Sequence, residues 1–190
     1  FKSLTLFPEI ENKSFNSLEP IHFILGTGRS GTTILRVMLA GHPHIFCPPE
    51  MMLAFFDTMQ QRKELMDNAF WLKGGLRRAL MNLQNLTVDE SKSAVDDLIE
   101  KSVEEVYAHL QNLCDGKTII DKCPAVSYLP DSLQKLPDRF KNAKYIWIVR
   151  HPGSVIRSFE NMPMAEVMLQ GLPGINSAED AWRIGNENIQ

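Results

Sequence analysis

The sequence predicts an α/β fold in which a parallel sheet is flanked by helices and interrupted by a large helical insert. Three short apolar runs, residues 21–25, 117–121 and 144–149, have the composition of strands that are covered on both faces. Residues 51–112, between the first and second runs, carry apolar side chains at helical spacing. Strands that alternate with helices are typical of a parallel sheet, because each crossover needs a helix.

The first strand leads into a glycine loop and then into a helix. Residues 26–33 read GTGRSGTT, and apolar residues then recur at helical spacing until Gly41 and Pro43 supply a stop signal. The first N–H groups of a helix have no partner within the helix and carry the positive end of its dipole. The loop is therefore predicted to bind a phosphate group.

The spacing of this loop resembles the Walker motif G-x-x-x-x-G-K-[ST], with Gly26, Gly31 and Thr33 in register. The lysine that would contact the β- and γ-phosphates is Thr32 here, and a cation occurs earlier in the loop as Arg29. An ordinary nucleoside triphosphatase or nucleotide kinase is therefore a remote alternative, as is a non-catalytic nucleotide-binding module.

Composition fits a globular protein and limits the partners. Of the 190 residues, 44% are hydrophobic and 23% are charged, and a net charge of −3 without a long cationic run argues against nucleic-acid binding. No apolar run approaches the roughly 18 residues of a membrane span, so no membrane partner is expected. The first residues do not resemble a signal peptide, and we expect a cytoplasmic protein. The spacing of Cys47, Cys114 and Cys123 predicts reduced, buried thiols and no metal site.

The segments on either side of the first helix differ in character. Residues 1–20 show no sustained periodicity and are predicted to be a linker or irregular entry segment. The loop after the helix ends in Pro48, Pro49 and Glu50, and a helical pattern is expected to begin near Met51. Glu50 would then lie at a helix start, where it could either complement the dipole or act chemically.

The helical insert, about residues 51–112, is expected to form a lid that shapes a substrate tunnel. Gly74 and Gly75 are predicted to break its first half. Thr87 to Glu90 has the form of a capping box, and a single amphipathic helix is expected over residues 88–112.

Two cations follow predicted strands, at the sheet edge where open α/β sheets bind ligands. Lys122 follows the second strand and Arg150 follows the third. Pro152 is expected to open a helix that carries Ser158, so that Arg150 and Ser158 could converge on a second phosphate.

The last residues are predicted to contain a mobile loop, residues 162–176, and a helix capped by Ser177. The sequence stops inside that helix without closing strands. A C-terminal part of the domain is therefore expected to be missing.

Over roughly residues 20–190 the sequence resembles the P-loop sulfotransferases that use 3′-phosphoadenosine 5′-phosphosulfate (PAPS). Arg150 and Ser158 are similar to their 3′-phosphate motif. The segment up to Glu50 is similar to one that carries a catalytic glutamate in tyrosylprotein sulfotransferases, and Lys122 lies in a segment similar to their strand-end lysine. The residues similar to the 5′-phosphosulfate loop are Gly28, Arg29, Ser30, Gly31, Thr32 and Thr33.

The resemblance implies a fold of the P-loop type, PAPS as donor, 3′-phosphoadenosine 5′-phosphate (PAP) as product, and no required metal. It implies catalytic roles for Arg29, Glu50 and Lys122, with Glu50 as the base. Other bases remain open, either in a C-terminal part outside this sequence or among the histidines His22, His42, His44 and His151.

Within the family, the loop GTGRSGTT at residues 26–33, the segment PPE at residues 48–50 and the segment WRIGN at residues 182–186 look most like sulfotransferase domains of cyanobacterial olefin-forming polyketide synthases of the curacin type. This implies sulfo transfer to the β-hydroxyl of an acyl chain on an acyl carrier protein, followed by formation of a terminal alkene by a neighbouring thioesterase. Residues 1–20 would then be an interdomain linker. A protein tyrosine, a carbohydrate and a small-molecule hydroxyl remain alternative acceptors.

Overall fold

The computed structural model describes residues 20–66, 74–163, 169, 172 and 174–190. The predicted linker at residues 1–20 lies outside this part except for its last residue. Part of the predicted mobile loop, residues 164–168, 170–171 and 173, also lies outside it.

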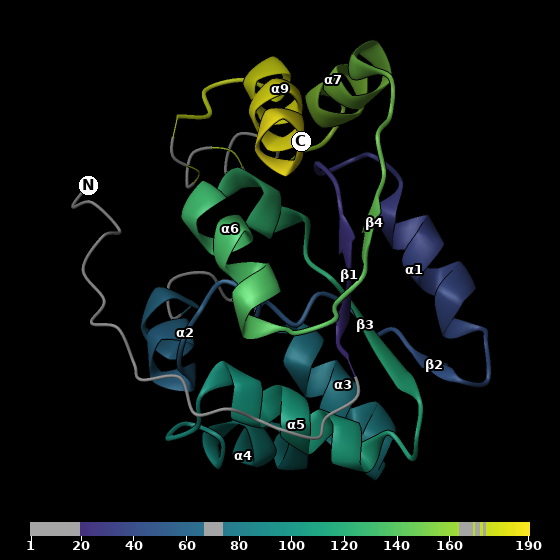
Figure 1. The fold of residues 1–190 in the computed structure, drawn as a ribbon, viewed down its shortest axis with the longest axis vertical. Coiled ribbons are helices and arrows are strands. Elements are labelled where there is room, and N and C mark those ends of the chain that lie inside the picture. Colours follow the sequence, from purple (N-terminus) through teal and green to yellow (C-terminus); the bar gives the residue numbers. More distant parts are fainter. Residues whose placement is uncertain (1–19, 67–73, 164–168, 170–171, 173) are drawn as a thin grey trace.

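Within the described residues, a four-stranded parallel sheet has the strand order β2-β3-β1-β4 (Figure 1). Its strands are β1 (His22–Leu25), β2 (Ile45–Phe46), β3 (Thr118–Lys122) and β4 (Tyr145–Trp147). The predicted parallel α/β arrangement is confirmed, and the three predicted strands occur within a residue or two of their expected ends. The two-residue strand β2 was not predicted, because its run is too short to show a period.

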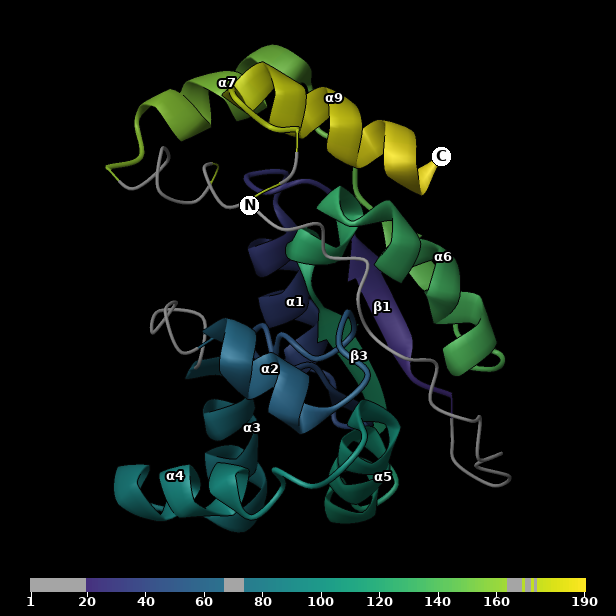
Figure 2. The same ribbon diagram turned by 90° about the vertical axis from the view of Figure 1, so that its left-hand side faces the viewer.

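Helices surround the sheet and form the predicted insert (Figures 1 and 2). The elements α7 and α9 lie together beyond the carboxyl end of β1, whereas α4 and α5 lie near its opposite end. None of the described helices is both long and apolar enough to cross a bilayer. The bounds are α1 (Thr32–Ala40), α2 (Met59–Met66), α3 (Gly74–Gln84), α4 (Val88–Asp96), α5 (Val103–Leu113), η2 (Pro124–Tyr128), α6 (Pro130–Arg139), α7 (Pro152–Glu160) and α9 (Ala178–Ile189).

The core lies mainly between β1 and the helical insert. Phe23 in β1 is 1% exposed, and its ring lies 5.0 Å from that of Phe140 and 6.4 Å from that of Tyr107 in α5. On the other face of the sheet, Leu35 and Leu39 of α1 pack against Ile24. The apolar residues of β1 are therefore covered on both faces, as a central parallel strand requires.

The single helix expected over residues 88–112 is wrong. The chain forms α4 and α5, separated by turns, and Leu98 between them is buried in the core. Both helices begin with a complete capping box, at Thr87 for α4 and at Ser102 for α5. The second box was overlooked because the apolar spacing runs on through Leu98 and hides the break.

The helix expected to begin near Met51 is also wrong, and Glu50 does not lie at a helix start. The chain from Met51 to Ala54 is buried without regular structure, Met52 has a positive φ of 54°, and α2 begins only at Met59. A role for Glu50 in complementing a helix dipole at that point is thereby removed.

Candidate functional site

The glycine loop joins β1 to α1 at the carboxyl edge of the sheet, as predicted. The element η2 holds it: Gly28 N–H donates to Tyr128 Oη at 2.9 Å, and Gly26 N–H donates to Ser127 Oγ at 3.4 Å. Gly31, the residue before α1, provides no side-chain cap. No capping side chain therefore uses the first N–H groups of α1, and they can donate to a ligand. This is the arrangement that binds phosphate.

Arg29, Arg150 and Ser158 meet beside this loop, although 121 residues separate the two arginines. Arg150 Nη1 donates to the Arg29 carbonyl at 2.9 Å, and Arg29 Nε donates to Ser158 Oγ at 2.9 Å. Arg29 has a positive φ of 64°, a left-handed conformation that is uncommon for a residue other than glycine. The two predicted phosphate subsites thus lie side by side, and the Arg29 guanidinium is bonded to the Ser158 hydroxyl.

Helix α9 fixes the strand end that carries Arg150. Trp182 Nε1 donates to the Arg150 carbonyl at 2.8 Å, and Asn186 Nδ2 donates to the Trp182 carbonyl at 2.7 Å. At Gly185 an added Cβ would lie 2.7 Å from the Thr27 side chain, so only glycine lets α9 approach the loop this closely. The sequence predicts this helix but no role for Trp182, Gly185 or Asn186.

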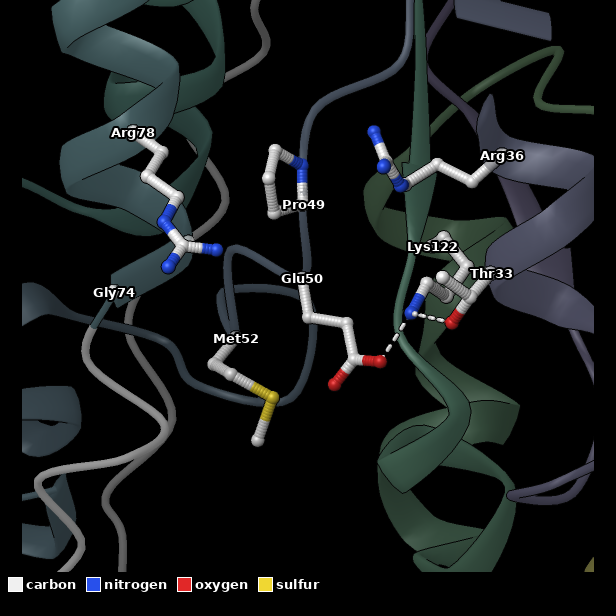
Figure 3. A pocket seen from close by; sticks show the side chains of 9 residues that line it. Thr33, Arg36, Pro49, Glu50, Met52, Gly74, Arg78 and Lys122 are labelled. Carbon is white, nitrogen blue, oxygen red and sulfur yellow. Dashed lines mark hydrogen bonds and ion pairs between the residues drawn. The ribbon is translucent and has the colours of Figure 1, made fainter. Parts of the chain in front are cut away.

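Glu50, Lys122 and Thr33 form a second cluster, next to the start of α1 (Figure 3). Lys122 Nζ forms an ion pair with Glu50 Oε1 and donates to Thr33 Oγ1 at 3.3 Å. The Lys122 side chain is 4% exposed, whereas that of Glu50 is 37% exposed. A buried ammonium needs such a partner, whereas Glu50 is still partly exposed to solvent.

A buried carboxyl, that of Asp121, directly precedes Lys122 in β3. Asp121 accepts a hydrogen bond from Tyr107 Oη at 2.5 Å, and Tyr107 belongs to α5 of the insert. Burial, more than any nearby charge, raises the pKa of Asp121 to about 6. The bond fastens α5 to the residue before Lys122, so the insert supports the strand end.

The insert also fixes the backbone at Glu50. Buried Arg62 of α2 donates to the carbonyls of Met51 and Met52 at 3.0–3.3 Å. Gly75 of α3 leaves no room for a side chain, because a Cβ there would overlap the Glu50 carbonyl. The sequence predicts only a helix break at Gly75, because no signal in it distinguishes a break from a close approach of two backbones.

A pocket of about 280 Å³ opens over Glu50 and Lys122 (Figure 3). Arg36 of α1 lies on one side and Arg78 of α3 lies on the other. The predicted catalytic pair therefore forms part of the wall of this pocket. Its lining residues are Thr33, Arg36, Pro49, Glu50, Met52, Gly74, Gly75, Arg78 and Lys122.

The remaining predictions about single residues have mixed outcomes. His22, one of the alternative bases, begins β1 and accepts a hydrogen bond from Lys144 N–H, at the opposite end of the strand from the loop. Cys47, Cys114 and Cys123 are buried and free, as expected. Ser177 caps α9 by accepting from Asp180 N–H at 3.0 Å, which confirms the predicted helix start.

Comparison with solved structures shows two similar domains. A sulfotransferase domain from the curacin biosynthetic pathway is 40% identical with a TM-score of 0.80, over 90% of this chain and 60% of that one. The sulfotransferase domain of the Synechococcus PCC 7002 olefin synthase is 37% identical with a TM-score of 0.82, over 96% of this chain and 63% of that one. This chain thus spans about three fifths of each.

Comparison with curated sequences and with family models also finds sulfotransferases. A putative protein-tyrosine sulfotransferase of Caenorhabditis briggsae is 27% identical over 144 residues, which is 75% of this chain and 44% of that protein. The chain spans less than half the length of this relative. Residues 20–187, which include both clusters, match the model of the sulfotransferase family. The chain belongs to the sulfotransferase family.

Proposed function

We propose that this protein transfers a sulfo group from PAPS to the β-hydroxyl of an acyl chain carried by an acyl carrier protein. The observation that carries the proposal is the pairing of two clusters, an arginine-serine cluster at the glycine loop and the Glu50–Lys122 pair at the adjoining pocket. The first suits a donor with two separate phosphate groups, and the second suits proton removal beside a cation.

The residues at the loop fit PAPS. A 3′,5′-phosphorylated nucleotide presents two anionic ends, and this site offers the uncapped start of α1 at one and Arg150 with Ser158 at the other. In the structure the Arg29 side chain already donates a hydrogen bond to the Ser158 hydroxyl. For Arg29 to act on the sulfo end, its side chain must leave Ser158 when the nucleotide binds, so the catalytic role of Arg29 remains a prediction.

The chemistry that we assign to the second cluster needs few groups. The Glu50 carboxylate takes the proton of the acceptor hydroxyl, whose oxygen then forms the new bond to sulfur. As the bond from sulfur to the bridging oxygen of the 5′-phosphate breaks, its electron pair stays on that oxygen. The Lys122 ammonium, held by Thr33 next to the start of α1, stabilises the charge that develops there.

The choice of acceptor rests on similarity and on the resemblance described above. Identities of 40% and 37% to domains from a curacin pathway and an olefin synthase exceed the 27% to a protein-tyrosine sulfotransferase. An acyl chain on a carrier protein is therefore favoured over a tyrosine, a carbohydrate or a small molecule. A thioesterase that eliminates the sulfate would be the consuming partner.

The test is a mass assay for PAPS-dependent sulfonation of a 3-hydroxyacyl carrier protein, with Glu50→Gln as the variant. Glutamine keeps an oxygen for Lys122 but cannot take a proton, so we expect turnover to fall about 10²- to 10⁴-fold while PAP still binds. The matched control is Glu64→Gln, which removes an exposed carboxylate of α2. Turnover within threefold of the unmodified protein in Glu50→Gln would show that the base lies elsewhere.

A further inference from the structure

A second pocket continues the first along the surface. It measures about 270 Å³, and it shares Arg36 and Pro49 with the pocket over Glu50. The two therefore form one groove between α1 and α3, with Cys47 and the two prolines that precede Glu50 as part of its lining. Glu50 and Lys122 lie at one end, and Lys117 lies at the other.

The charges along this groove are nearly all positive. Arg36, Arg78, Lys117 and Lys122 line it, and Glu50 is the only acidic residue among the lining residues. Glu50 pairs with Lys122, and Arg36 donates to the Cys47 carbonyl at 3.1 Å. Lys117 is exposed, directly before β3. The end of the groove away from Glu50 thus has a cation that is suited to an anionic group.

The length of the groove limits what that anion is attached to. Lys117 directly precedes β3 and Lys122 ends it, so their Cα atoms are about 16 Å apart at roughly 3.3 Å per residue. This is a backbone distance, and the flexible Lys117 side chain sets where along the groove its ammonium lies. In a phosphopantetheine thioester, about 16 bonds separate the phosphorus from the β-carbon of the acyl chain. Extended chains span at most about 3.3–3.6 Å per three bonds, so this distance is about 18 Å.

We infer that the groove holds the phosphopantetheine arm of the carrier protein, with the acyl β-hydroxyl at Glu50 and the arm's phosphodiester at Lys117. The inference rests on the proposed function, because it assumes an acceptor on such an arm. It adds the path of the arm and a specificity-determining contact outside the catalytic pair. Lys117 would select acceptors that carry a phosphate at the correct distance from the hydroxyl.

The experiment compares two acceptors with the same 3-hydroxyacyl group, one on phosphopantetheine and one on N-acetylcysteamine, which lacks the phosphate. The readout is the ratio of their kcat/KM values. We expect Lys117→Gln to lower this ratio about two- to fivefold, as an exposed charge contact should, and Lys117→Glu to lower it further. Added salt should lower the ratio in the unmodified protein, because it screens exposed charges.

The matched control is Lys141→Gln, which removes an exposed ammonium just after α6 and outside the groove lining; its ratio should stay constant. An equal ratio in Lys117→Gln and the unmodified protein, with both acceptors turned over, overturns the inference and leaves the proposed function standing. Sulfonation of an acidic tyrosine peptide but of neither thioester overturns both, as does a lack of turnover with every acceptor.

Discussion

Replacing Arg62 by methionine should destabilise the protein, because Arg62 supports the backbone that follows Glu50. Three hydrogen bonds from its guanidinium satisfy the carbonyls of Met51 and Met52, residues that are 0% and 3% exposed. A buried polar group left without a partner costs about 1–3 kcal/mol. Two such carbonyls would cost about 2–6 kcal/mol of the free energy of unfolding.

A second effect opposes this loss. Burial lowers the pKa of Arg62 to about 10, which shows that the fold disfavours its charged form, and methionine removes that cost. We therefore expect the lower half of the range, about 2–4 kcal/mol. For a chain of this size each kcal/mol lowers Tm by about 2–4 °C, so Tm should fall by about 4–16 °C.

The assay is urea and thermal unfolding of Arg62→Met beside Lys63→Met, an exposed neighbour in α2 that should change stability by less than about 0.5 kcal/mol. Turnover should fall as well, since the carbonyls held by Arg62 directly follow Glu50. Arg62→Lys should recover part of the stability through one remaining donor. A free energy of unfolding for Arg62→Met equal to that of Lys63→Met would refute the reasoning.

Three further predictions concern the donor site and the buried carboxyl. Arg150→Ala should weaken PAP binding about ten- to a hundredfold in calorimetry and leave ATP nearly unaffected, because it removes a charge-assisted contact to the 3′-phosphate; equal losses would contradict the assignment. Trp182→Phe removes the N–H that holds the Arg150 carbonyl, so PAP affinity should fall several-fold while adenosine 5′-phosphosulfate binds as before. Burial raises the pKa of Asp121 to about 6, so at this carboxyl the folded state binds more protons than the unfolded chain between about pH 4 and 6. The contribution of Asp121 to stability should therefore fall by about 3 kcal/mol across that window as pH rises. Urea titrations should show this change in the difference between the free energies of unfolding of the unmodified protein and Asp121→Asn.

Local patterns in the sequence were sufficient for part of the fold. The apolar runs identified β1 and β3, because a central parallel strand must be apolar on both faces. The run at β4 was found by the same composition, although β4 lies at the edge of the described sheet and its residues are exposed. Capping residues identified the starts of α4 and α9, because Thr87 and Ser177 bond the N–H groups of their own first turns. These features depend on neighbours three or four residues away, so the sequence alone reveals them.

Positions set by distant contacts could not be obtained in this way. The break before Ser102 depends on burying Leu98, and the irregular chain after Glu50 depends on Arg62 supplying donors from α2. In both segments the apolar residues have the spacing of a helix, although the chain forms buried turns or irregular structure there. Both predicted helices were therefore wrong where a tertiary contact replaced helical hydrogen bonds.

The sequence by itself determined which side chains are available: a phosphate loop with Arg29 in place of the Walker lysine, a glutamate after two prolines, and a lysine at a strand end. Only the tertiary structure decided which of them meet. It paired Glu50 with Lys122, which are 72 positions apart in the sequence, and it bonded the Arg29 side chain to the Ser158 hydroxyl, 129 positions apart. The physical reason is that parallel strands bring their carboxyl ends to one edge, while the packing of the insert and of α9 sets the direction of each side chain there.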